Sequence, residues 1–107
     1  MTSAYINAKV DLTDTDVTTL YTCPSVTTAI VTSILVSEDS GNADTITVTL
    51  TNSAAAVFSL FKVKAVSANT TVELLTRPLV VEEAEILKVT AATGGRLHVV
   101  ASLLELS

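Results

Sequence analysis

The sequence predicts an all-β fold: a single-domain antiparallel β-sandwich, jelly-roll-like, with about eight strands. Three observations predict it. Threonine and valine, which favour strands, are abundant. No long stretch repeats apolar residues at helical spacing. Short strand-like runs recur with polar turns between them, as in sandwiches and barrels. The single domain is expected to span residues 1–107, with residues 1–3 and residue 107 frayed.

Three strands are predicted in the first third of the chain. Residues 4–12, AYINAKVDL, alternate between an apolar and a polar face, and residues 17–22 form a shorter run. Pro24 then ends the second strand, because proline has no N–H to donate to a ladder. A long strand, TAIVTSILVS, follows at residues 28–37.

The middle of the chain predicts a turn and two strands. Residues 38–44, EDSGNAD, are polar with glycine at the centre, and residues 45–50, TITVTL, alternate so cleanly that one face should meet solvent. In residues 56–65, AVFSLFKVKA, the apolar phase changes near Leu60. A one-residue slip turns side chains over, so we expect a bulge or bend there.

The last third predicts three more short strands and a final long one. They occupy residues 71–75, 79–81, 86–91 and 97–106, separated by SANT, RP and the acidic run VEEAE. The hairpin before the last strand contains TGG at residues 93–95, where glycine supplies a positive φ.

The last strand is apolar on both faces. Leu97, Val99, Ala101 and Leu103 share one face, whereas Val100, Leu104 and Leu106 share the other with His98 and Ser102. The strand at residues 28–37 is similar, with Val31 and Leu35 on one side and Ile30, Ile34 and Val36 on the other. A sandwich buries only one face of each sheet against its partner sheet.

The second apolar face therefore needs a cover, which could be a loop, a helix or a neighbouring subunit. No helix is predicted and the loops are short, so we favour a neighbouring subunit around a symmetry axis. The interface residues that we predict are Val100, Leu104, Leu106, Ile30 and Ile34. Two alternatives stay open: Leu97 and Leu103 lie at the interface instead, or the N-terminal segment overlays a central strand.

We predict no catalytic, cofactor-binding or metal-binding residue. His98 is the only histidine, so a triad within one subunit would need it, and three copies could hold a transition metal on a trimer axis. An ordinary half-buried histidine is the favoured interpretation. Cys23, beside Pro24, resembles a small apolar turn residue more than a nucleophile.

Two groups of acidic residues offer oxygen ligands or acid and base pairs. Glu38, Asp39, Asn42 and Asp44 could bind Ca²⁺, although their spacing does not match the helix-flanked calcium loop, so a solvated turn is favoured. Glu82, Glu83 and Glu85 are expected to form a charged face in a turn without a pocket.

Charge and hydropathy limit the partners. The net charge is −5 and the six basic residues are scattered, which argues against a nucleic-acid partner. No apolar run of about 18 residues predicts a membrane span, and no signal peptide is evident. We therefore expect synthesis in a cytoplasm, with the sequon at residues 69–71 unused.

The order of strands and turns resembles small jelly-roll virion proteins of tailed bacteriophages, of the capsid decoration (cement) or tail-attachment type. The stretches VTTAIVTSILVSEDSGNADTITVTLTN and ANTTVELLTRPLVVEEAEILKVTAATGGRLHVVASLLEL carry the resemblance, which covers the chain from about Val17 onward. One departure is Glu83-Ala84-Glu85, where a Gly-Asp turn would be expected before LKVTA. The resemblance brings no catalytic residue to this chain.

The resemblance implies a homotrimer on a phage virion, made in the bacterial cytoplasm, that stabilises the head lattice by contact with the major capsid protein and performs no catalysis. The alternative virion role is attachment in the tail, neck or a fibre, with tail proteins as partners. A carbohydrate-binding module for host adsorption is disfavoured because the chain has no tryptophan and few aromatic platforms. A cupin-type enzyme would need several histidines.

Overall fold

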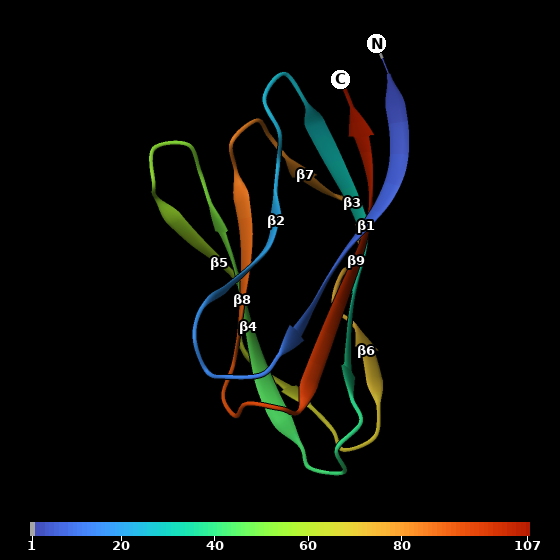
Figure 1. Ribbon diagram of the computed structural model, residues 1–107, viewed down its shortest axis with the longest axis vertical. Coiled ribbons are helices and arrows are strands. Elements are labelled where there is room, and N and C mark those ends of the chain that lie inside the picture. The colour runs from blue at the N-terminus through green and yellow to red at the C-terminus, as the bar shows by residue number, and fades with distance from the viewer. Residues whose placement is uncertain (1) are drawn as a thin grey trace.

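The computed structural model describes residues 2–107, which form nine strands in two antiparallel sheets (Figure 1). The strands are β1 (Ser3–Leu12), β2 (Thr18–Thr22), β3 (Thr28–Glu38), β4 (Asp44–Thr51), β5 (Val57–Val66), β6 (Thr71–Glu73), β7 (Leu79–Val81), β8 (Ile86–Ala91) and β9 (Leu97–Leu106). The predicted all-β sandwich is confirmed. Within the described range no helix is long and apolar enough to cross a membrane.

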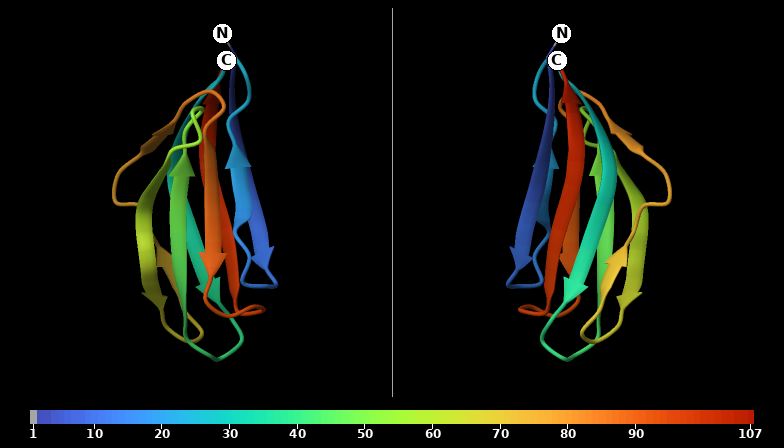
Figure 2. Two further views of the ribbon diagram at one scale, coloured as in Figure 1. Left: turned by 90° about the vertical axis from the view of Figure 1, so that its left-hand side faces the viewer. Right: turned by 90° about the vertical axis from the view of Figure 1, so that its right-hand side faces the viewer.

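The two sheets differ in how their strands are ordered. Sheet A has the order β1-β9-β3, and both β6 and β7 pair with the free edge of β3. Sheet B has the order β2-β8-β4-β5. The two sheets face one another along the long axis of the molecule, and both chain ends lie at the same end of it (Figure 2).

The core lies between the sheets and is built from alternate residues of each central strand. On β9, Leu97, Val99, Ala101 and Leu103 are each 1% exposed or less. Opposite them, Ile46 and Val48 of β4 and Leu87 and Val89 of β8 are completely buried. The alternation predicted for β9 and β4 is therefore confirmed, because these buried residues occur at every second position of each strand.

A bulge in β3 overturns one part of the predicted pattern. The register of β3 against β9 shifts between Val31 and Ser33, so Val31 and Ile34 both face the core and both are completely buried. Ile34 was predicted to share the outer face with Ile30, and this prediction is wrong. One extra residue in the bulge moves every following side chain of β3 to the opposite face.

Glu73 on β6 holds this bulge in place. Its carboxylate accepts hydrogen bonds from the backbone N–H of Ile34, at 2.8 Å, and from the hydroxyl of Ser33. Burial raises the pKa of Glu73, but the bonds from Ser33, Ile34 and Leu75 outweigh burial and lower that pKa. A charged side chain from a neighbouring strand thus satisfies the amide that the bulge frees from the ladder.

The edge strand β5 is irregular at two places. Its register against β4 shifts between the Ser59 and Phe61 pairs, which confirms the bulge predicted near Leu60, and it shifts again between Phe61 and Lys64. Val63, in the second irregular stretch, has a φ of 52°. Bulges of this kind are typical of sheet edges, where they hinder uncontrolled pairing with other chains.

The two ends of the chain pair with one another. Thr2 and Ser107 exchange two backbone hydrogen bonds, at 2.6 and 2.8 Å, and so extend the β1–β9 ladder beyond Ser3 and Leu106. This differs from the fraying expected for residues 2, 3 and 107, because each end supplies the other's backbone partners. Met1 lies outside the described residues.

The predicted glycine turn before β9 is confirmed. Gly95 has a φ of 78°, and Gly94 lies so close to the segment after β1 that an added Cβ would be 2.5 Å from the carbonyl oxygen of Thr13. The turn therefore packs against the β1–β2 connection and closes that end of the sandwich.

Candidate assembly interface

The outer face of sheet A carries a continuous apolar row. In the strand registers Tyr5 pairs with Leu104, Leu104 with Ile30, and Ile30 with Val80, so the row crosses β1, β9, β3 and β7. Tyr5 is 84% exposed and Val80 is 52% exposed, while Ile30 and Leu104 are partly exposed. No element of the described chain covers this row, which we call the apolar row.

A second apolar pair lies on the same face, toward the other end of β9. Val100 pairs with Leu35, and these residues are 37% and 39% exposed. Lys9 flanks the pair on β1 and Glu73 flanks it on β6. The face therefore combines two apolar areas with charged residues at their edges, Lys9 and Glu73 beside the second pair and Asp11 at one end. Apolar areas of this kind with a polar rim are typical of protein interfaces.

The outer face of sheet B is different in kind. Its outward residues on the central strands are mostly threonines, with one lysine and one isoleucine: Thr45, Thr47, Thr49, Thr51, Thr90, Lys88 and Ile86. This agrees with the solvent-facing side predicted for residues 45–50. The two outer faces of one small domain thus differ in polarity. The apolar row of sheet A crosses four strands, whereas the apolar side chains on sheet B lie at one end, at Ile86 and the edge residue Val57, which both pair with Thr51.

Four of the five predicted interface residues lie on the outer face of sheet A. They are Val100, Leu104, Leu106 and Ile30. The fifth, Ile34, belongs to the core for the reason given above. The alternative pair, Leu97 and Leu103, is buried within this subunit and is therefore not available to a second one.

Sequence reasoning missed three residues of this face. Tyr5 was assigned to a polar side of the first strand, yet the strand register aligns it with Leu104. Leu35 and Val80 were missed because the β3 bulge and the pairing of β7 are tertiary features. The local sequence offered no signal for the bulge, because an unbroken strand that is apolar on both faces has the same pattern.

His98 sits at one end of the outer face of sheet A between two carboxylates. Its Nε2 lies 3.2 Å from Asp11 Oδ1 and its Nδ1 lies 3.7 Å from Asp39 Oδ1. All three side chains are substantially exposed. In residues 2–107 no three acidic, histidine or cysteine side chains are grouped so as to hold a metal ion.

The candidate cation loop at residues 38–44 is organised around one buried carboxylate. Glu38 is 2% exposed, and its oxygens accept hydrogen bonds from the backbone N–H groups of Ser40, Gly41, Asn42 and Asn69. Burial raises the pKa of Glu38, but these bonds together with the Ser40 hydroxyl lower it to about 2. The carboxylate of Glu38 therefore satisfies backbone N–H groups of its own chain.

The other candidate ligands of that loop are engaged elsewhere. Asp44 Oδ2 accepts the backbone N–H of Thr93 at 3.1 Å, and Asp39 faces His98. The four oxygen ligands considered from the sequence are thus not brought together around one point. The prediction of a solvated turn holds for Asp39 but not for Glu38 and Asp44, which are buried.

Cys23 is buried and lacks the setting of a reactive thiol. Its Sγ lies 3.3 Å from the carbonyl oxygen of Thr27, to which it donates. Burial raises the pKa of the Cys23 thiol, whereas nucleophilic cysteines have a lowered one. The residue packs at the turn between β2 and β3, as its position before Pro24 suggested.

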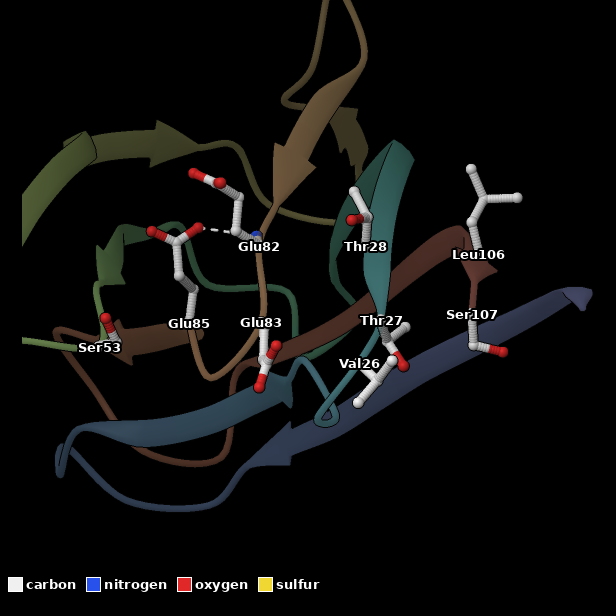
Figure 3. A pocket seen from close by; sticks show the side chains of 9 residues that line it. All are labelled: Val26, Thr27, Thr28, Ser53, Glu82, Glu83, Glu85, Leu106 and Ser107. Carbon is white, nitrogen blue, oxygen red and sulfur yellow. Dashed lines mark hydrogen bonds between the residues drawn. The ribbon is translucent and has the colours of Figure 1, made fainter. Parts of the chain in front are cut away.

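The expectation that Glu82, Glu83 and Glu85 lie in a turn without a pocket is wrong: they line an open hollow of about 500 Å³ at the end of the sandwich where the termini lie (Figure 3). Glu85 accepts the backbone N–H of Glu82 at 2.8 Å. Val26, Thr28 and Leu106 complete its rim together with Thr27, Ser53 and Ser107. The hollow therefore joins the acidic turn to the outer face of sheet A, on which Thr28 and Leu106 lie.

Comparison with known proteins identifies a likeness of fold. No protein-family model and no curated protein matches the sequence. Among solved structures, a chain from infectious bursal disease virus, Gx strain, is similar with a TM-score of 0.58 and 8% identity, over 96% of this chain and 32% of that one. A chain from the Gt strain has a TM-score of 0.46 and 8% identity, over 98% and 30%. This protein thus corresponds to about a third of the viral chain's length.

Proposed function

We propose that this protein is a non-enzymatic structural protein of a virion that assembles with copies of itself through the outer face of sheet A. The single observation that carries the proposal is the contrast between the apolar row on sheet A and the threonine face of sheet B. Each apolar side chain of this size contributes about 1.5 to 3 kcal/mol when it is fully buried. Covering the row with a second copy would therefore stabilise the assembly.

The size of the face also suits a stable contact. The molecule measures 44 × 26 × 22 Å, and sheet A spans its long axis. A stable interface buries about 800 Å² on each partner, which a face of these dimensions can supply. The likeness to a chain from a virus structure supports a sandwich of the type that virions use, and it is a likeness of fold alone.

The finer part of the proposal concerns the kind of virion and the place on it. Following the resemblance of the strand and turn order, we assign the protein to a tailed bacteriophage, as a homotrimeric decoration protein bound to the major capsid protein. Many weak contacts to a repeating lattice add by avidity, so a small subunit without a catalytic centre can stabilise a large shell.

The proposed place on the virion is tested by counting copies and by removing the protein. Purified particles should contain hundreds of copies, and particles lacking the protein should lose their genome at a lower temperature than complete ones. Copy numbers of a few to a few tens, with a defect in adsorption or tail assembly instead, would contradict decoration and indicate attachment. Particles unaltered in both respects would contradict a structural role.

A further inference from the structure

The sandwich has an open seam opposite β1, between β5 of sheet B and the short strands β6 and β7 of sheet A. A hollow of about 310 Å³ lies along it. Its apolar lining consists of Leu60, Phe61, Leu74, Leu75 and Leu79. Figure 2 shows the β6–β7 connection running beside β5, where β3 has only two three-residue strands on its flank. We call this hollow the seam groove.

The seam groove has a positive rim in an acidic protein. Arg77 lines the groove, and no aspartate or glutamate does. Lys64 pairs in register with Ile46, and Phe61 pairs with Val48; both partners face the core. The Lys64 side chain therefore extends from β5 on the same side as Phe61, toward the open seam. Two of the six basic residues thus lie at or beside the groove, although the net charge is −5. A negatively charged partner would therefore be favoured.

The opposite combination lies at the end of the molecule. The acidic corner, as we call it, consists of Glu82, Glu83, Glu85 and the tip of the β2–β3 turn, Val26 (Figure 3). Val26 is 78% exposed. The corner thus presents an apolar tip beside three carboxylates, whereas the seam groove presents an apolar floor beside positive charges.

Backbone conformation singles out the same two surfaces. Among residues 2–107, two β-branched residues have a positive φ: Val26, at 54°, and Val63, at 52°, between Lys62 and Lys64. Both side chains are more than half exposed, so neither packs in the core. Val63 lies in the second bulge of β5, where its N–H donates to Thr47 Oγ1 at 3.1 Å. Glycine or asparagine adopts this conformation at lower cost than valine does. Strain of this kind is typical of functional surfaces.

We propose that the seam groove of one copy receives the acidic corner of a second copy. Val26 would enter the apolar groove, and Glu82 and Glu83 would face Lys64 and Arg77. The inference rests on the self-association proposed above and specifies how it occurs. Because the corner adjoins the outer face of sheet A through Leu106 and Thr28, a neighbour seated on the corner also reaches that face.

The two surfaces are different, and this matters for the symmetry of the assembly. A contact between identical faces gives a two-fold dimer, whereas a contact between two different patches gives a closed ring such as a trimer when the rotation closes. The groove and corner supply the two different patches that a trimer requires.

Charge reversal tests the pairing in the full-length protein by sedimentation velocity at low salt. The variants Lys64→Glu/Arg77→Glu and Glu82→Lys/Glu83→Lys should each weaken self-association at least about tenfold, because like charges then meet. The quadruple variant, which exchanges the charges of both surfaces and keeps the net charge, should recover it. Lys88→Glu, on the threonine face, is the matched control for Lys64→Glu and should have little effect.

Val26→Gly tests the apolar tip separately from folding. Glycine accepts the positive φ, so dissociated subunits of the variant should unfold at the same urea concentration as those of the unaltered protein or higher, yet the variant should associate more weakly. Association equal to that of the unaltered protein would contradict insertion of Val26 into the groove.

Two results would overturn the pairing of groove and corner: double variants that associate normally, or a quadruple variant that associates as weakly as the doubles. Either result, with the unaltered protein still an oligomer, leaves the proposed function standing. A monomeric unaltered protein at micromolar concentration would instead contradict self-association itself.

Discussion

Glu38 shows how one residue can have a role that its sequence neighbourhood conceals. Within EDSGNAD it looked like one of several carboxylates in a solvated turn. The structure buries it and surrounds it with backbone N–H donors, one of which belongs to Asn69, 31 positions further along the chain. The donor that completes the arrangement is distant in sequence, so no local pattern could predict it.

The protonation of Glu38 makes stability depend on pH in a definite direction. Its pKa in the folded protein, about 2, lies below the ordinary value of 4.5. The stabilisation from the ionised form is therefore present above pH 4.5 and is lost as pH falls from 4.5 toward 2. Glu38→Gln should lower the melting temperature near neutral pH, and its difference from the unaltered protein should shrink in acid.

Thermal melts at neutral pH and near the folded-state pKa check this expectation. Asp39→Asn, at the neighbouring exposed carboxylate, is the control for removing one charge from the same loop. An equal loss of melting temperature for Glu38→Gln at both pH values would show that the ionised carboxylate is not what stabilises the loop.

At the scale of single elements, β9 and β3 show where sequence patterns succeed and fail. Both faces of β9 were assigned correctly because the strand has no bulge between Leu97 and Leu106, so strict alternation holds. The same reasoning failed on β3, where the bulge at residues 32–33 puts Ile34 in the core. The bulge is held by Glu73, about 40 positions away, which the local sequence of β3 does not reveal.

The phase of β3 predicts that truncating its two isoleucines has unequal effects on the free energy of unfolding. Ile34→Ala removes a completely buried side chain and should cost about 2 to 5 kcal/mol of unfolding free energy. Ile30→Ala removes a partly exposed one and should cost the single subunit less than about 1.5 kcal/mol. Urea unfolding measured on dissociated subunits gives both values.

A reversed order, with Ile30→Ala the more damaging change in dissociated subunits, would contradict the bulge. It would restore the continuous alternation that the sequence alone suggested for this strand. Val36→Ala, which lies beyond the bulge and also faces the core, extends the test because it should behave like Ile34→Ala.

At the scale of the whole molecule, the sequence predicted the fold class and the existence of a second apolar face. Composition and alternation suffice for both, because they depend on each strand separately. The alignment of Tyr5, Leu104, Ile30 and Val80 into one row depends on the registers of three strand pairs. The seam groove depends likewise on the pairing of β6 and β7 with β3, which no single stretch of sequence encodes.

The central claim is that copies of this protein cover the outer face of sheet A. Sedimentation velocity of the purified protein at micromolar concentration, alongside Leu104→Asp and Thr49→Asp, tests it most directly. We predict a trimer for the unaltered protein and for Thr49→Asp, on the threonine face, and folded monomers for Leu104→Asp, since the buried charge would have no partner. A monomeric unaltered protein, or a Leu104→Asp variant that stays assembled, would contradict the account.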